Sequence, residues 1–176
     1  LYNVQIECLN SSDGDHYDPR TDTVRLSYNN YNGTSVTAVS VAAHECGHAI
    51  QHAHGYVPMN IRAALVPVVN IGSNLSIPLI FLGVLLSWNQ TLIQLGIWAF
   101  ALTVIFQLVT LPVEFNASHR AIVKVEEYGL LGREEVSGGK KVLTAAALTY
   151  VAGAASSALQ LLRLILLYGG NRRRRD

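Results

Sequence analysis

The residues best suited to chemistry lie together in one short segment, His44-Glu45-Cys46-Gly47-His48. The segment has the pattern H-E-x-x-H, and the apolar residues around it recur at helical spacing. Because residues four apart share one face of a helix, both imidazoles can bind a single zinc ion. Glu45 then lies beside an open coordination position, where it can accept a proton from metal-bound water. The motif therefore predicts one catalytic Zn²⁺, with His44 and His48 as ligands and Glu45 as the base.

A catalytic zinc ion needs a third protein ligand, and the sequence offers two candidates. His54 stands ten residues after His44, which is the spacing of a longer zinc motif, but Gln51 replaces the glycine that bends the chain there. Glu114 is the first charged residue after a long apolar run. Two antiparallel helices with a short tip return the chain to the side that it left. We therefore favour Glu114 as the third ligand and keep His54 as the alternative.

The motif is expected to lie on a helix at residues 35–54. Turn-forming residues precede Ser35, which can cap the helix, and Gly55 supplies a stop. Weak alternation at residues 2–8 and 23–27 is typical of strands, and turn residues separate the two segments. The fold class that follows is mainly α, with a zincin-like α+β metal-binding portion joined to three transmembrane helices.

The charge distribution carries the membrane prediction. The chain of 176 residues has 25 charged ones, yet residues 63–113 carry none. That run is about twice the ~20 apolar residues that cross a bilayer. It divides into helices at 64–86 and 91–113 around a polar tip, and a third apolar stretch at 144–168 is rich in small residues that favour close packing. The charge distribution therefore favours a membrane protein over a wholly soluble single domain.

The rest of the composition excludes other classes. A net charge of +1 gives no support to nucleic-acid binding, and Cys8 and Cys46 can form one bridge at most.

The chain begins at Leu1 and runs into polar sequence, so we expect a fragment or processed form that lacks an N-terminal segment. The predicted organisation is a zincin-like portion at 1–62, a transmembrane hairpin at 63–113, amphipathic linker helices at 114–143, a third transmembrane helix at 144–168 and a basic tail at 169–176. The linker carries ten charges and four expected breakers, Gly129, Gly132, Gly138 and Gly139.

Four blocks of the sequence also carry a resemblance. They are Asp15-His16-Tyr17-Asp18-Pro19-Arg20, the metal motif with its flanks at 41–52, residues 65–74, and Leu111-Pro112-Val113-Glu114-Phe115-Asn116-Ala117-Ser118. Together they resemble the YugP-type family of membrane-bound neutral zinc metallopeptidases. The chain is more distantly similar to HtpX-like proteases and to type I CaaX prenyl proteases. The resemblance implies a membrane zinc peptidase whose third ligand is a downstream glutamate.

In those relatives an aspartate commonly follows the glutamate ligand by four residues and orients a zinc histidine. Ser118 holds that place here. A hydroxyl can make the hydrogen bond but brings no negative charge, so the group that orients His44 or His48 stays open. Asn116, in the same block, is a second candidate for contact with the ligands.

The resemblance further implies that residues 23–27 form a strand above the metal helix. Val24, Arg25 and Leu26 would then offer a free edge that pairs with an extended peptide substrate. A zinc peptidase also needs a donor to the developing oxyanion. Tyr17 and His119 are the candidates we retain, alongside Tyr28 and Tyr31.

The leading hypothesis is a membrane-embedded zinc endopeptidase that acts on peptides or membrane proteins at a prokaryotic cell membrane. The alternatives are a catalytically silent membrane module with a structural metal and a soluble protease that uses His54. The orientation stays open. Arginines at 172–175 favour a cytoplasmic C-terminus and an outward site, whereas the related proteases work on the cytosolic side. The substrate and the oligomeric state are not predicted.

Overall fold

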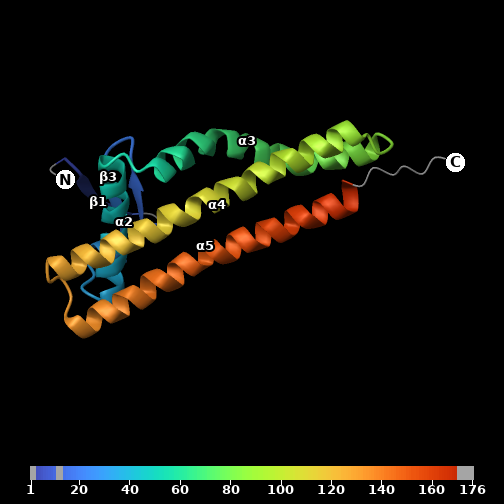
Figure 1. Ribbon diagram of the computed structural model, residues 1–176. Helices are drawn as coiled ribbons and strands as arrows, with labels where there is room; N and C mark the ends of the chain where they lie inside the picture. The colour runs from blue at the N-terminus through green and yellow to red at the C-terminus, as the bar shows by residue number, and fades with distance from the viewer. Residues whose placement is uncertain (1–2, 11–13, 170–176) are drawn as a thin grey trace. The chain divides into compact units, whose positions relative to one another are not determined.

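The computed structural model describes residues 3–10 and 14–169, and Figure 1 shows its ribbon. The elements in chain order are β1 (Gln5–Leu9), β2 (His16–Asp18), β3 (Thr23–Ser27), α1 (Tyr28–Tyr31), α2 (Val36–Ala53), α3 (Val57–Leu85), α4 (Gln90–Glu127) and α5 (Arg133–Tyr168). The chain is thus mostly helical with one small sheet, which confirms the predicted fold class. The predicted basic tail, apart from Gly169, lies outside the described residues.

Two compact units make up the chain. The first contains residues 1–60 and 111–149, and the second contains residues 61–110 and 150–176. Helices α3, α4 and α5 each contribute to both units, because each runs without a break across a boundary.

The sheet of the first unit has the strand order β1-β3-β2. Strand β1 pairs with β3 in parallel, and β2 pairs with it antiparallel, so that Val24 faces Ile6 on one side and Tyr17 on the other. The expectation of a free edge at Val24, Arg25 and Leu26 is therefore wrong. Strand β3 was predicted with its observed bounds, whereas the three-residue β2 is too short to show alternation and was missed.

Helix α2 has nearly the predicted limits because both end signals act. The Ser35 hydroxyl accepts a hydrogen bond from the Ala38 N–H at 3.1 Å, which satisfies one of the unpaired donors of the first turn. At the other end Gly55 adopts a positive φ of 61°. The helix packs on the sheet and on α4 through a small apolar core, whose buried members are Tyr17, Val24, Leu26, Ala49, Met59 and Val113.

The expected linker at 114–143 is more regular than the sequence suggested. Helix α4 ends at Glu127, and Gly129 follows it with a positive φ of 62°. Gly138 and Gly139 lie inside α5 and do not break it. A Cβ at Gly139 would lie 2.6 Å from the Ser40 Oγ. That glycine therefore allows α5 to pass close to α2, so it serves helix packing instead of ending a helix.

The second unit contains the tip of the hairpin and the end of α5. Its α3 and α4 segments pack closely, since the Ser76 hydroxyl donates to the Gly96 carbonyl at 2.8 Å and a Cβ at Gly96 would lie 2.7 Å from the Ser76 carbonyl oxygen. The Gln107 amide donates to the Ser157 hydroxyl on α5 at 2.8 Å. Helices α3, α4 and α5 are each long and apolar enough to cross a membrane, as the charge distribution predicted.

Candidate metal centre

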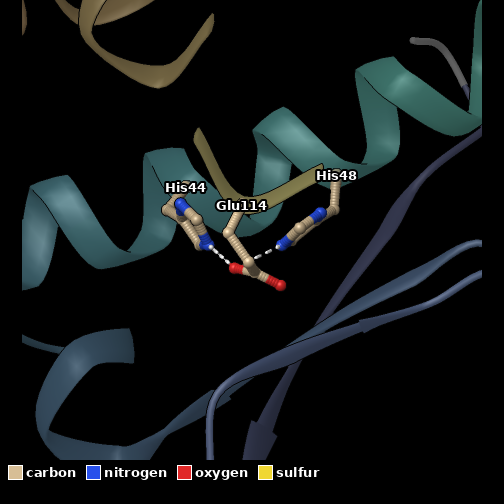
Figure 2. A group of neighbouring side chains, drawn as sticks. All are labelled: His44, His48 and Glu114. Atoms are coloured by element: carbon tan, nitrogen blue, oxygen red, sulfur yellow. Dashed lines mark hydrogen bonds and ion pairs between the residues drawn. The ribbon is translucent and has the colours of Figure 1, made fainter. Parts of the chain in front are cut away.

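Three side chains converge in the first unit, as Figure 2 shows: His44 and His48 from α2, and Glu114 from α4. Their potential ligand atoms all lie within 4.8 Å of one another. The Glu114 Oε2 lies 3.2 Å from the His44 Nε2 and 3.6 Å from the His48 Nε2. The structure thus brings together the two motif histidines and the glutamate that lies 66 residues beyond His48.

His54, the alternative ligand, lies elsewhere. It is the exposed C-cap residue of α2, and its Nδ1 lies 2.8 Å from the Ile50 carbonyl oxygen. The helix continues through Gln51 without the bend that would turn His54 back toward His44. The geometry therefore supports Glu114 as the third donor.

The approach of α4 to α2 depends on Gly47, which lies between the two histidines. A Cβ at this position would lie 2.5 Å from the Ala117 carbonyl oxygen, which is a steric clash. Since Ala117 and Glu114 are three residues apart, they lie on neighbouring turns of the same face of α4. The glycine thus lets the α4 backbone come close enough for Glu114 to reach both imidazoles.

The site is largely closed to solvent. Glu114 is 2% exposed, and Glu45 and His48 are each 7% exposed. Burial raises the pKa of Glu45, although the two histidines act in the opposite direction. For His48, burial opposes protonation, but hydrogen bonding and attraction to Glu114 outweigh it and raise the pKa.

The donor set fits zinc. Zinc binds imidazole nitrogen and carboxylate oxygen at about 2.0–2.2 Å, so donors around a tetrahedral ion lie about 3.4 Å apart. The two nitrogen–oxygen distances of 3.2 and 3.6 Å match that separation. Three protein donors also leave one tetrahedral position for water or substrate, which is the arrangement of catalytic zinc sites. His44, His48 and Glu114 are therefore the residues that would hold the ion.

Further polar groups contact the outer nitrogens of the histidines. The Ser118 Oγ lies 3.1 Å from the His44 Nδ1, at the place where the resemblance implied an orienting group. Gln51 contacts the His48 Nδ1 and is fully buried, with its amide also hydrogen-bonded to Asn116. The sequence interpretation named Ser118 and Asn116 for this role but missed Gln51. The available signal was its position three residues after His48, on the same face of α2.

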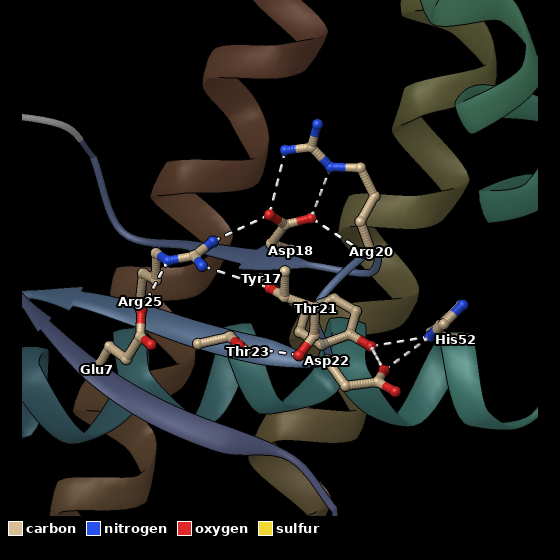
Figure 3. Close-up of polar contacts among 9 residues, drawn as sticks. All are labelled: Glu7, Tyr17, Asp18, Arg20, Thr21, Asp22, Thr23, Arg25 and His52. Atoms are coloured by element: carbon tan, nitrogen blue, oxygen red, sulfur yellow. Dashed lines mark hydrogen bonds and ion pairs between the residues drawn. The ribbon is translucent and has the colours of Figure 1, made fainter.

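The candidates for oxyanion stabilisation lie in different surroundings. The Tyr17 hydroxyl lies 2.6 Å from the Asp22 Oδ1, to which it donates, and 2.8 Å from the His52 Nδ1 (Figure 3). Burial and the contact with Asp22 raise the pKa of this phenol well above its usual value. His119 is exposed and lines a cavity of about 290 Å³. Tyr28 and Tyr31 are exposed on α1, and the oxyanion role stays a prediction.

An ion-pair network fixes the sheet in front of α2 (Figure 3). Asp18 accepts hydrogen bonds from the guanidinium groups of Arg20 and Arg25, and Arg25 also contacts Glu7 on β1. The hydrogen bonds from Arg20 are the largest cause of an Asp18 pKa well below its usual range. Because Arg25 lies on β3 between Asp18 and Glu7, this network links all three strands.

Comparisons with known proteins agree with the geometry. The model of a family described as "Putative neutral zinc metallopeptidase" matches residues 1–169. The chain belongs to this family. It is also 49% identical over 150 residues to the "Putative membrane protease YugP" of Bacillus subtilis (strain 168), an alignment that covers 85% of the chain and 66% of that relative. No solved structure matches the chain.

These findings confirm the resemblance to the zinc-peptidase family and the prediction of a membrane protein. With three candidate membrane-spanning helices and a relative named as a membrane protease, the chain is an integral membrane protein. It spans about two thirds of that relative's length.

Proposed function

We propose that this zinc-peptidase family member is a membrane-embedded endopeptidase that hydrolyses peptide bonds with one zinc ion. The observation that carries the proposal is the convergence of His44, His48 and Glu114, with the acidic Glu45 adjacent to the first histidine on α2. Family membership supports the metal and the reaction class.

The proposed roles follow from the positions of the side chains. His44, His48 and Glu114 would hold a zinc ion, which would supply Lewis-acid chemistry: polarisation of the scissile carbonyl and a lower pKa for bound water. Glu45 accepts a proton from the attacking water and then delivers it to the departing amine.

The substrates that fit this proposal are peptides or membrane proteins. The metal ligands belong to the same chain as three helices that can cross a bilayer, so a polypeptide at the membrane surface is the accessible substrate class. Hydrolysis by a site on an integral membrane protein also agrees with the name of the Bacillus relative.

The test is Glu45→Gln in the purified protein, assayed with an unbiased peptide library after zinc loading. We expect the variant to retain zinc and to lose peptide hydrolysis, because the amide keeps the shape of the side chain but cannot accept the proton. Glu134→Gln, the same change at an exposed position in the first turn of α5, is the matched control and should remain active. Undiminished hydrolysis in the Glu45 variant contradicts the assignment. A wild-type protein that binds zinc and cleaves nothing favours the silent metal module instead.

A further inference from the structure

Gln51 occupies a position that the proposed reaction does not use directly. Its side chain is fully buried on α2, one turn after His48. The amide nitrogen donates to the Val113 carbonyl at 2.8 Å and to the Asn116 Oδ1 at 3.0 Å, while the amide oxygen lies 3.0 Å from the His48 Nδ1. A single neutral side chain therefore joins a proposed metal ligand on α2 to two residues of α4.

The chemistry of the partners fixes which end of the Gln51 amide faces which group. The Val113 carbonyl can only accept a hydrogen bond, so it must face the amide NH₂. The Arg120 guanidinium can only donate, and its Nε lies 2.8 Å from the Asn116 Oδ1. That oxygen is thereby oriented toward Arg120 and Gln51 together. Turning either amide over would place donor against donor or acceptor against acceptor.

The same logic assigns the proton on His48. Since the NH₂ of Gln51 faces Val113 and Asn116, its oxygen faces His48 and can only accept. The His48 Nδ1 must then carry the hydrogen. In the neutral ring this leaves the Nε2 lone pair unprotonated, and the Nε2 is the atom that lies 3.6 Å from the Glu114 Oε2.

We propose that Gln51 is a positioning residue that holds His48 in the Nδ1–H tautomer, with its Nε2 directed to the metal. This inference rests on the proposed zinc site. Gln51 also anchors the backbone of Val113, which immediately precedes Glu114, and so it aligns two of the three ligands at once. Ser118 differs, because a hydroxyl beside the His44 Nδ1 can donate or accept and does not fix a tautomer.

The role matches that of the groups that orient zinc histidines elsewhere, with one difference in charge. Zinc-bound histidines commonly donate to a carboxylate, a carbonyl or water, and loss of that partner lowers metal affinity about 10–100-fold. Here the acceptor is an uncharged amide in a site that already contains the buried carboxylates of Glu45 and Glu114. A neutral acceptor fixes the ring without adding a third negative charge.

The experiment measures zinc affinity of the full chain in detergent by competition with a chelator, and the visible spectrum of the cobalt-substituted protein. Gln51→Met keeps the length of the side chain and removes all three hydrogen bonds. We expect zinc affinity about 10–100-fold weaker and a changed cobalt spectrum, which reports ligand geometry. Met59→Ala is the control, because it leaves a cavity in the same core without touching a polar partner of the site.

The outcomes separate the two proposals. Retention of wild-type affinity and spectrum by Met59→Ala, together with their change in Gln51→Met, supports the positioning role. Wild-type affinity in Gln51→Met overturns it, and so does equal weakening in both variants with an unchanged spectrum. If the wild-type protein binds no zinc, the proposed function itself fails, and this inference fails with it.

Discussion

Gly47→Ala is the substitution whose outcome the crossing of α2 and α4 predicts most sharply. The added Cβ would lie 2.5 Å from the Ala117 carbonyl oxygen and 3.1 and 3.2 Å from the carbonyl carbon and Cα of the same residue. All three are backbone atoms, so no side-chain rotation relieves the contact. Carbon–oxygen contacts in proteins settle at about 3.3 Å or more, which means that α4 must retreat from α2 by about 0.8 Å.

The retreat carries Glu114 with it, because this residue lies one turn before Ala117 on the same helix. A misplacement of about 1 Å in a catalytic constellation costs on the order of 10²-fold in rate. We expect that loss in peptide hydrolysis and at least about a tenfold loss in zinc affinity, which corresponds to about 1.4 kcal/mol. We also expect a lower melting temperature in detergent.

Gly138→Ala is the matched control. Its Cβ would meet only the Val36 Cγ1, at 3.4 Å, inside helix α5. Alanine is favoured over glycine in a helix interior by about 1 kcal/mol, so this variant should melt at the same temperature or higher and bind zinc normally. A lower melting temperature in Gly47→Ala and an equal or higher one in Gly138→Ala would show that the close crossing of α2 and α4 requires a glycine. Wild-type zinc affinity and stability in Gly47→Ala would refute the reasoning.

Ion pairing lowers the pKa of Asp18 in the folded protein. Its contribution to stability is therefore present above the pKa of an unfolded aspartate, about 3.9, and is lost as the pH falls below that value. Asp18→Asn should reduce the drop in melting temperature between pH 5 and pH 2, and an unchanged drop would contradict this. Gly96→Val should impair hairpin packing and lower the yield of folded protein, since its Cβ would lie 2.7 Å from the Ser76 carbonyl oxygen. Gly14→Ala should not, because a Cβ there has no atom of the described residues within 4 Å. Removal of zinc with a chelator should lower the melting temperature of the wild-type protein, because zinc binding at 100 times Kd stabilises the folded state by about 2.7 kcal/mol. The melting temperature of Glu114→Ala should not change on chelation.

The parts of the fold that the sequence predicted are those set by local signals. The capping of α2 by Ser35 and its end near Gly55 depend on neighbouring residues. Two of the candidate membrane helices follow from the uncharged run at 63–113, and the third follows from the separate apolar stretch at 144–168. The convergence of Glu114 with the histidines was within reach because a hairpin constrains where its ends can lie. The geometry brings the three residues together as that argument requires.

Features that depend on how elements cross were not available from the sequence. The pairing of β3 on both sides results from strand register and from β2, which is too short to show a pattern, and so the expected free edge at Val24, Arg25 and Leu26 was wrong. The sequence suggests that Gly139 breaks a helix. Its observed role is to leave room for Ser40, and this contact exists only when α5 packs against α2.

The role of Gln51 was hidden for a similar reason. An amide on a helix face is usually a solvated residue. Only the approach of Val113 and Asn116 from α4 adds two partners to the contact with His48 and buries the Gln51 side chain. Its value to the site therefore depends on contacts between segments 62 and 65 residues apart in the chain.

Zinc stoichiometry in purified Glu114→Ala and His54→Ala, compared with the wild-type protein, tests the proposed metal centre most directly. The geometry predicts one zinc ion per chain in the wild-type protein and in His54→Ala, because His54 is exposed and lies apart from the converging donors. It predicts loss of zinc in Glu114→Ala, where one of three donors is gone. Full zinc occupancy in Glu114→Ala, or its loss in His54→Ala, would contradict the assignment.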